Sequence, residues 1–259
     1  MRSILVFSLI VAVASLAAAP ASSPKSAPAA APREPFQVTW LGHAAFEVRS
    51  SGGTRILIDP FLKQNGRTPE EFKNLSRYKP NVILVTHSHF DHSADVLEIA
   101  KASGAPVISA FEWLEALDLP DAQKLGGNVG GTFKVGDVAV HIVPAMHSSA
   151  PSGRPVGFVL TFADGRALYH TGDTWIFGDM ALIQEIYHPN VILLNVGGGY
   201  YGADPQTAAL AIKKYFNPQT IVPMHFGTFP ALSTEADVAA AFKGDRRFLM
   251  MTPGQTKEF

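Results

Sequence analysis

The sequence predicts an α/β protein in which two mixed β-sheets pack face to face and helices cover their outer faces. From residue 36 onward, short runs of apolar and β-branched residues alternate with helical patterns. Many of these runs are apolar on both faces of the predicted strand, which is typical of sheets covered on both sides. Two stacked sheets with helices outside would use all of these elements.

The elements follow one another without a second linker, so we expect one domain over residues 36–259. The predicted strands are 36–40, 54–59, 81–86, 106–109, 137–143, 157–162, 167–171, 190–195 and 220–224. The predicted helices are 94–103, 112–117, 179–187, 205–216 and 234–242.

The first 21 residues have the pattern of a secretory signal peptide, with one early cation, an apolar run and then small residues. The apolar run is shorter than the roughly 20 residues that a membrane-spanning helix needs, which argues against an uncleaved anchor. We therefore expect a periplasmic or secreted protein, cleaved after Ala17, Ala19 or Ala21. Residues 22–35 are rich in Pro, Ala and Ser and are predicted to be a linker.

The composition limits the partners and the chemistry. A net charge of -1 provides no long-range field for nucleic acid or an anionic membrane. The chain has no cysteine, which excludes disulfides, thiolate ligands and cysteine nucleophiles. Any metal ion must therefore be held by histidine, carboxylate and water.

Polar residues follow four of the predicted strands at the point where each strand ends. These segments are THSHFDHS (86–93), MHSS (146–149), TGDT (171–174) and HFGTF (225–229). Loops at one edge of rigid sheets commonly assemble a functional site. We expect these four segments to meet.

THSHFDHS places four possible metal ligands, His87, His89, Asp91 and His92, within six residues. On an extended loop, alternating residues would direct one pair to one centre, while a turn at Phe90 and Asp91 would present the other pair to a second. Imidazole and carboxylate suit zinc, and suit iron or manganese less exclusively. The alternative, a solvated polar loop, is disfavoured by this density of ligands after a buried strand.

THSHFDHS resembles the HxHxDH signature of the metallo-β-lactamase superfamily, and the family's other motifs follow in order. The segments that carry the resemblance are WLGHAAFEV (40–48), ILIDPF (56–61), His147, YHTGDT (169–174) and VPMHFGTFP (222–230). More narrowly, GHAAF, IDPF, GDT and PMHFGTFP resemble metal-dependent hydrolases related to ascorbate-6-phosphate lactonase and to phosphodiester-cleaving phospholipases. The resemblance covers the whole predicted domain and implies an αββα sandwich.

The resemblance also implies two metal ions, most simply zinc, with manganese or iron(II) as alternatives. It assigns His87, His89 and His147 to one ion, Asp91, His92 and His225 to the other, and Asp173 to both. Two adjacent divalent ions lower the pKa of a shared water from 15.7 towards roughly 7 and polarise the bond under attack. No protein nucleophile is then needed, so Ser148 and Ser149 are interpreted as loop residues.

The sequence therefore predicts an exported hydrolase that uses a bridging hydroxide on an ester, lactone or phosphodiester of a small-molecule or lipid-derived substrate. The catalytic candidates are Asp91, Asp173 and His43. Export argues against a sugar-phosphate lactone, because such metabolites stay in the cytoplasm. Antibiotic β-lactams are also less favoured, since the narrower motifs point elsewhere.

Two alternatives stay open. One is a non-catalytic metal-binding or ligand-binding module that kept the fold. The other is a membrane-associated lipid hydrolase with an exposed apolar patch formed by Trp175, Phe177 and Phe229, whose simpler interpretation is core packing. Membrane association and nucleic-acid binding are not expected.

Several residues near the motifs have predicted supporting roles. Asp59 is expected to hydrogen-bond the ligand loop, with plain turn chemistry as the alternative. His43 ends a strand at a position that the resemblance places near the pocket, and is expected to contact substrate or to support a ligand. For His170 the sequence leaves two interpretations, a residue that supports a ligand or a histidine of the core. His141 and His188 are expected to be structural.

The segment NVGGGYYGADP (195–205) departs from the branch, in which many relatives have an aspartate at this point. Three consecutive glycines permit a close backbone approach or an unusual turn. Tyr200 and Tyr201 are candidates to line a pocket, and the alternative is a flexible loop tip with half-buried tyrosines.

Overall fold

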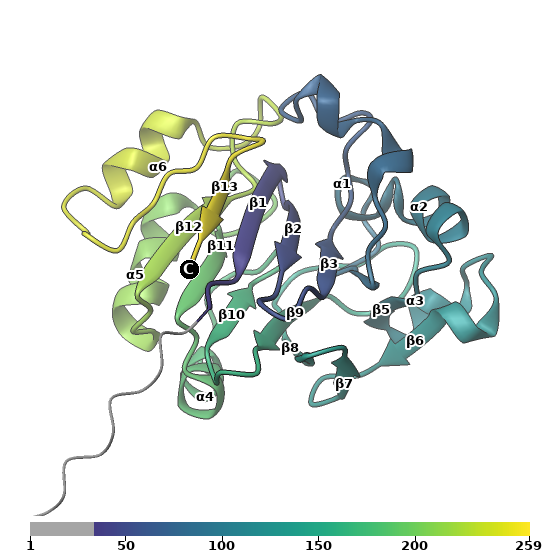
Figure 1. Cartoon of the computed structure of the whole chain (residues 1–259). Helices are drawn as coiled ribbons and strands as arrows, with labels where there is room; N and C mark the ends of the chain where they lie inside the picture. Colours follow the sequence, from purple (N-terminus) through teal and green to yellow (C-terminus); the bar gives the residue numbers. More distant parts are fainter. Residues whose placement is uncertain (1–33) are drawn as a thin grey trace, which may run out of the picture. The chain divides into compact units, whose positions relative to one another are not determined.

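Two mixed β-sheets lie at the centre of the protein, as the sequence predicts (Figure 1). The computed structural model describes residues 34–259. The predicted signal peptide and residues 22–33 of the predicted linker lie outside the described residues. All nine predicted strands and all five predicted helices are present, and their ends agree with the prediction to within two residues.

The first sheet has seven strands, in the order β13 (Thr256–Glu258), β1 (Gln37–Gly42), β2 (Ala45–Arg49), β3 (Arg55–Ile58), β4 (Val82–Leu84), β5 (Val107–Ala110) and β6 (Lys124–Gly127). Its pairs are antiparallel from β13 to β3 and parallel from β3 to β6. The second sheet has six strands, in the order β12 (Thr220–Met224), β11 (Val191–Asn195), β10 (Ala167–His170), β9 (Val156–Thr161), β8 (Val138–Pro144) and β7 (Thr132–Val135). Its first three strands are parallel and the others antiparallel.

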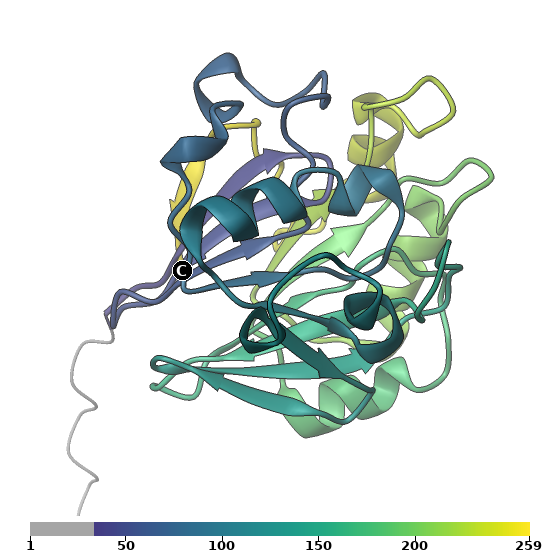
Figure 2. The same ribbon diagram turned by 90° about the vertical axis from the view of Figure 1, so that its right-hand side faces the viewer.

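Helices cover the outer faces of both sheets (Figures 1 and 2). Those of the first sheet are α2 (Val96–Ser103) and α3 (Phe111–Glu115), and those of the second are α4 (Met180–Tyr187), α5 (Pro205–Tyr215) and α6 (Glu235–Ala241). A short helix, α1 (Phe90–Ser93), precedes α2, and 3₁₀ turns occupy Glu70–Phe72, Leu75–Arg77 and Asp121–Gln123. Within residues 34–259, no helix has the length and apolarity needed to cross a bilayer.

The side chains of β3 show why these strands are apolar on both faces. Ile56 and Ile58 are fully buried in the core between the sheets. Leu57, between them, is buried in a second cluster with Ile99 of α2 and Leu114 of α3. Because successive side chains of a strand point to opposite faces, a strand covered on both sides needs an unbroken apolar run.

Three strands at sheet edges, β6, β7 and β13, are absent from the prediction. Each has only half-buried or exposed residues, so none has the apolar run that marks a central strand. The prediction also missed β2 as a separate strand. The chain reverses between β1 and β2 at Gly42 and His43, which both have positive φ, and the sequence gives no strong signal for such a turn at a histidine.

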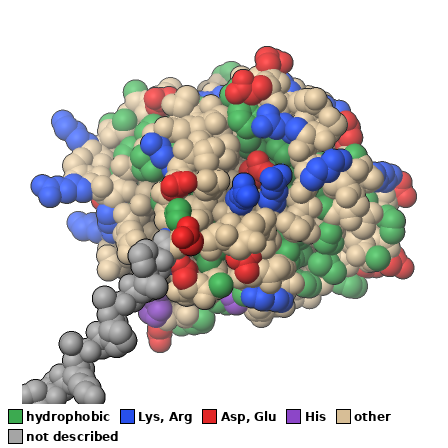
Figure 3. Space-filling model, viewed as in Figure 1, with side chains coloured by type: hydrophobic (Ala, Val, Ile, Leu, Met, Phe, Trp, Pro, Cys, Tyr) green, Lys and Arg blue, Asp and Glu red, His purple; other side chains and the backbone are tan. Residues whose placement is uncertain are grey.

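Charged side chains of both signs are interspersed on the face shown in Figure 3. Together with the net charge of -1, this distribution provides no extended basic surface on that face for a polyanion.

Candidate metal centre

The four polar segments meet, as the sequence predicts. The loops after β4, β8, β10 and β12 bring together His87, His147, Asp173 and His225. Among the described residues, three overlapping groups of possible metal ligands form where the loops converge, and they are His87, His89 and His147; Asp91, His92 and His225; and His87, His92 and Asp173. The turn between β1 and β2 adds His43 to the second of these groups. Rigid sheets thereby fix residues that are far apart in the chain.

THSHFDHS turns at Phe90 and Asp91, as the sequence predicts, and this turn is the short helix α1. His89 is the N-cap of α1, and the amides of His92 and Ser93 donate to its carbonyl oxygen at 3.0 and 3.1 Å. The helical turn places Asp91 and His92 in one group of possible ligands with His225, whereas His87 and His89 belong to another group with His147.

The first centre contains His87, His89 and His147. Nε2 of His87 lies 2.9 Å, and Nε2 of His147 lies 3.3 Å, from Nδ1 of His89. Two nitrogens bound to one zinc ion at about 2.0–2.1 Å with tetrahedral angles lie about 3.3 Å apart, so this spacing fits one ion. Burial lowers the pKa of His87 and of His147, which keeps both in the neutral form that binds a cation.

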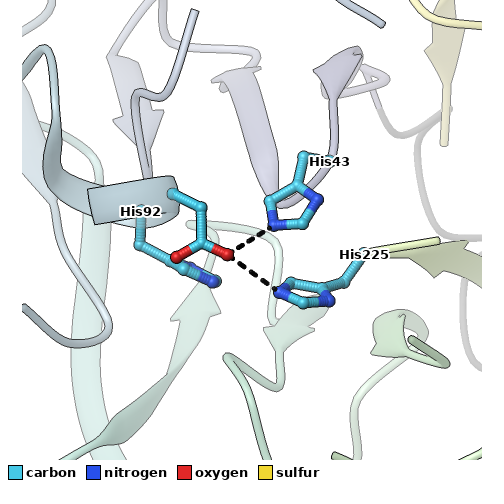
Figure 4. A group of neighbouring side chains, drawn as sticks. His43, His92 and His225 are labelled. Carbon is cyan, nitrogen blue, oxygen red and sulfur yellow. Dashed lines mark hydrogen bonds and ion pairs between the residues drawn. The ribbon is translucent and has the colours of Figure 1, made fainter. Parts of the chain in front are cut away.

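The second centre contains Asp91, His92 and His225. Nε2 of His225 lies 3.6 Å from Oδ2 of Asp91, and Figure 4 shows His43, His92 and His225 around one carboxylate. The Nε2 atoms of His92 and His225 are buried and have no hydrogen-bond partner. Buried polar atoms are nearly always satisfied, so two unpaired nitrogens beside a carboxylate fit a bound cation.

Asp173 lies between the two centres. Its Oδ2 is 3.0 Å from Nε2 of His225 and 3.7 Å from Nε2 of His147, and its Oδ1 is 3.4 Å from Nε2 of His92. The surrounding histidines hold the pKa of Asp173 well below its usual range although the carboxylate is buried. This position fits the bridging role that the resemblance implies, and the assignment of individual ions stays a prediction.

Asp59 makes the supporting hydrogen bonds that the sequence predicts. It accepts from the amide and the hydroxyl of Thr86, each at 2.7 Å, and lies 2.7 Å from Nδ1 of His92. Because a carboxylate only accepts, Nδ1 of His92 carries the proton and Nε2 faces the centre. Asp59 is fully buried with φ at 46°, a strained conformation that these bonds maintain.

His43 supports Asp91 and does not line the pocket described below. Its Nε2 lies 3.1 Å from Oδ2 of Asp91, and its Nδ1 lies 2.9 Å from the hydroxyl of Thr228. Burial and the nearby His225 lower the pKa of His43 to about 3, so it is neutral. Nε2–H then donates to Asp91 and Nδ1 accepts from Thr228. The geometry favours orientation of Asp91 over direct contact with substrate.

The other three histidines lie outside the two centres. His170 is a satisfied core histidine, since its Nε2 donates to the carbonyl of Ala44 and its Nδ1 accepts from the amide of Gly172. It thereby fixes the loop that carries Asp173. His141 lies between the hydroxyls of neighbouring strands, and His188 ends α4 with φ at 44°. Both are structural, as expected.

The three consecutive glycines pack closely against neighbouring segments of the chain, and Gly197 lies against His225 of the second centre. A Cβ on Gly197 would lie 2.5 Å from both Nδ1 and the backbone oxygen of His225. Gly198 and Gly199 have φ of 62° and 64°, and a Cβ on either would meet the chain near Ser233 and Ala231. The close backbone approach predicted as one interpretation is therefore correct, and each glycine has a steric reason.

Two further residues, Asn195 and Ser88, position the ligands and were missed in the sequence. Asn195 donates to Oδ1 of Asp173 at 2.9 Å and accepts from the amide of Gly197 at 2.9 Å. The Ser88 hydroxyl lies 2.9 Å from that of Ser149 and donates to the carbonyl of Ala150. It links the loop of His87 to that of His147. Ser88 stands between two candidate ligands in the sequence, whereas Asn195 has no candidate ligand beside it.

A cavity of about 660 Å³ opens onto the two centres. Its walls are formed by His89, Phe90, Asp91, His147, Ala150, Asp173, Tyr201, His225 and the segment 229–232. Tyr201 therefore lines a pocket, whereas Ser148 and Ser149 do not contribute to these walls.

Of the three aromatics proposed for a membrane patch, Trp175 is 58% exposed, Phe177 packs against the core and Phe229 lines the cavity. They do not form one exposed patch.

The chain is similar to proteins of one superfamily. Residues 37–225 match the model of the beta-lactamase superfamily domain. A UPF0173 metal-dependent hydrolase from Anaeromyxobacter dehalogenans is 42% identical over 239 residues, which cover 86% of each chain.

Two solved structures share the fold. The structure of Igni18, a metallo hydrolase from Ignicoccus hospitalis, has a TM-score of 0.75 at 34% identity and covers 87% of this chain and 98% of its own. The metallo-beta-lactamase fold protein from Bacillus subtilis has a TM-score of 0.69 at 12% identity and covers 88% of this chain and 100% of its own.

Metal binding should release protons at neutral pH. Burial alone would lower the pKa of His225, but the carboxylates of Asp173 and Asp91 outweigh it and raise the pKa to about 9. A cation must displace this proton, so between pH 6 and 9 the apparent affinity should rise about tenfold per unit for each proton released. Zinc titration calorimetry in buffers of different ionisation enthalpy measures the release. Equal release from the His225→Ala variant would contradict this origin.

The Gly197→Ala substitution should weaken the second centre. The added methyl group would collide with His225 and shift its ring, so affinity for the ion there should fall about 10–100-fold. Gly178→Ala is the matched control, because a Cβ at that position meets nothing within 4 Å. Metal content after dialysis measures the difference, and equal content in the two variants would refute the steric explanation.

Proposed function

Because the chain belongs to the beta-lactamase superfamily and is a metal-dependent hydrolase like its relatives, we propose that it binds two divalent ions and cleaves an ester, lactone or phosphodiester. Zinc suits a donor set of imidazole and carboxylate without thiolate, and manganese or iron(II) are the alternatives. The position of Asp173 carries this proposal, since its two oxygens face histidines of both centres.

Two bound ions would lower the pKa of water and polarise the bond to be cleaved. The residues of the chain prepare the site for this chemistry. Asp59 holds the tautomer of His92 that directs Nε2 inward, and His43 orients Asp91 through Nε2–H. Asn195 holds one oxygen of Asp173. Candidate ligands of both centres line the cavity, so a substrate in the cavity would contact both.

Substitutions at Asp173 and His225 test the number of ions. Asp173→Ala should lower the occupancy of both ions, whereas His225→Ala should mainly remove the second, and either should reduce kcat/KM by more than about 100-fold. Metal analysis is combined with assays on lactones, phosphodiesters and β-lactams, with and without chelator. Full occupancy in both variants would refute the ligand assignment. Two ions without turnover of any substrate would favour the non-catalytic binding module.

We also propose that the protein is exported, because residues 1–21 have the pattern of a cleavable signal peptide. Expression in a bacterial host should yield a periplasmic form that begins after Ala17, Ala19 or Ala21. Mass spectrometry of the fractionated protein measures this start. Recovery of only the full-length chain, confined to the cytoplasm, would contradict export.

A further inference from the structure

The walls of the cavity consist of two chemically different sets of residues. Five are the histidines and aspartates of the candidate centres. The others are Phe90, Ala150, Tyr201 and the segment 229–232, which reads Phe-Pro-Ala-Leu. Among these lining residues there is no lysine or arginine, and outside the centres only the hydroxyl of Tyr201 is a polar side-chain group. A substrate therefore meets the candidate ligands on one side and apolar surface on the other.

The apolar wall is packed and continuous with the core. Phe61, which is buried, has its ring centroid 5.7 Å from that of Phe90 and 6.2 Å from that of Phe229. Phe90 and Phe229 are 6.0 Å apart. These separations are typical of favourable aromatic pairs. Phe90, although 60% exposed, is thus part of a fixed aromatic cluster beside the candidate ligands.

The segment 229–232 is also fixed by its backbone. The amide of Leu232 donates to the carbonyl of Phe229 at 3.0 Å, and the amide of Ser233 donates to that of Gly197 at 2.8 Å. Gly199 packs against the carbonyl of Ala231. Since these amides are already paired, they are not available to bind an anionic substrate group.

Arg67, which packs near this segment, is directed away from the cavity. Arg67 lies over the rings of Trp40 and Phe226, donates to the carbonyl of Phe226 and lies 3.6 Å from the carboxylate of Glu235. It does not contribute to the cavity walls. None of the residues that line the cavity is therefore a cation that could neutralise a charged group of the substrate.

This wall distinguishes between the substrate classes of the proposed function. A sugar or a charged headgroup would lose its hydrogen bonds to water on entering, and the wall would replace few of them. An apolar chain would instead be removed from water against aromatic and aliphatic side chains. The interactions of the cleaved bond with the metal centre are common to both cases, so the wall decides the preference.

Building on the proposed hydrolase function, we propose that the substrate is an uncharged ester or lactone whose acyl portion is apolar and packs against Phe90 and residues 229–232. The bond between the acyl carbon and the leaving oxygen breaks. The hydroxyl group of a water molecule joins the acyl carbon, and the other proton of that water passes to the leaving oxygen. No oxidant, reductant or further reactant is needed.

Two p-nitrophenyl esters of equal chain length test this inference with the zinc-loaded protein. One is the octanoate, and the other is the half-ester of suberic acid, which ends in a carboxylate. Their reacting groups match, so kcat/KM should be about tenfold or more higher for the octanoate. The value of kcat/KM should also rise about tenfold or more from p-nitrophenyl acetate to p-nitrophenyl octanoate. Bis(p-nitrophenyl) phosphate tests the phosphodiester class. For this substrate and for the octanoate, the rate with the protein is divided by the rate of uncatalysed hydrolysis, and the two accelerations are compared.

A substitution in the wall provides the second arm. Ala231→Lys places a cation at an exposed position that lines the cavity, and should shift the octanoate-to-suberate ratio of kcat/KM about tenfold towards the charged ester. Ala102→Lys adds the same charge on the exposed side of α2 and should leave the ratio unchanged.

Equal turnover of the two C8 esters, no dependence on chain length, or greater acceleration of the phosphodiester would overturn the apolar-substrate inference while leaving the hydrolase function intact. An unchanged ratio in the Ala231→Lys variant would also overturn it, since the wall would then not face the chain. Absence of chelator-sensitive turnover on every one of these substrates would instead refute the proposed function, and this inference with it.

Discussion

The buried carboxylate of Asp173 imposes the strongest constraint on this protein. An ionised carboxylate in the interior is stable only when positive charge or hydrogen-bond donors surround it. Asn195 supplies one donor, and the remaining approach is taken by histidine nitrogens of both centres. A pair of cations would neutralise this group and also satisfy the unpaired nitrogens of His92 and His225. The loops that follow the strands of both sheets place the Asp173 carboxylate between the two groups of candidate ligands.

The same centre is supported by backbone conformations that are unfavourable in isolation. His43, Asp59 and His225 all have positive φ, and each such residue costs on the order of 1–3 kcal/mol. Fixed hydrogen bonds maintain them, including the bond from the amide of His225 to the carbonyl of His43 and the bonds that Asp59 accepts. Gly197 leaves the space that His225 occupies. Two fully packed sheets provide the rigidity that retains this strain.

The candidate ligands could be found in the sequence because they lie in short segments directly after apolar strands, in a spacing that few other structures need. Asp59 could be placed for the same reason. The partnership of His43 with Asp91, separated by 48 residues, and that of Ser88 with Ser149, separated by 61, could not. Nothing local requires either contact, since both depend on how loops from different strands approach one another. The turn at Phe90 and Asp91 was predicted, but its helical form was not, because four residues give no period.

The sequence by itself determined the two-sheet fold and the identity of the polar segments, because strand periodicity and ligand density are local properties of the chain. The tertiary structure decided which oxygen or nitrogen of each side chain faces the centre, as in the orientation of His92 by Asp59. It also decided that Gly197 lies against His225 and that residues 229–232 form an apolar wall. These features depend on close packing between distant segments, and such packing is fixed only when both sheets and their connecting loops are in place.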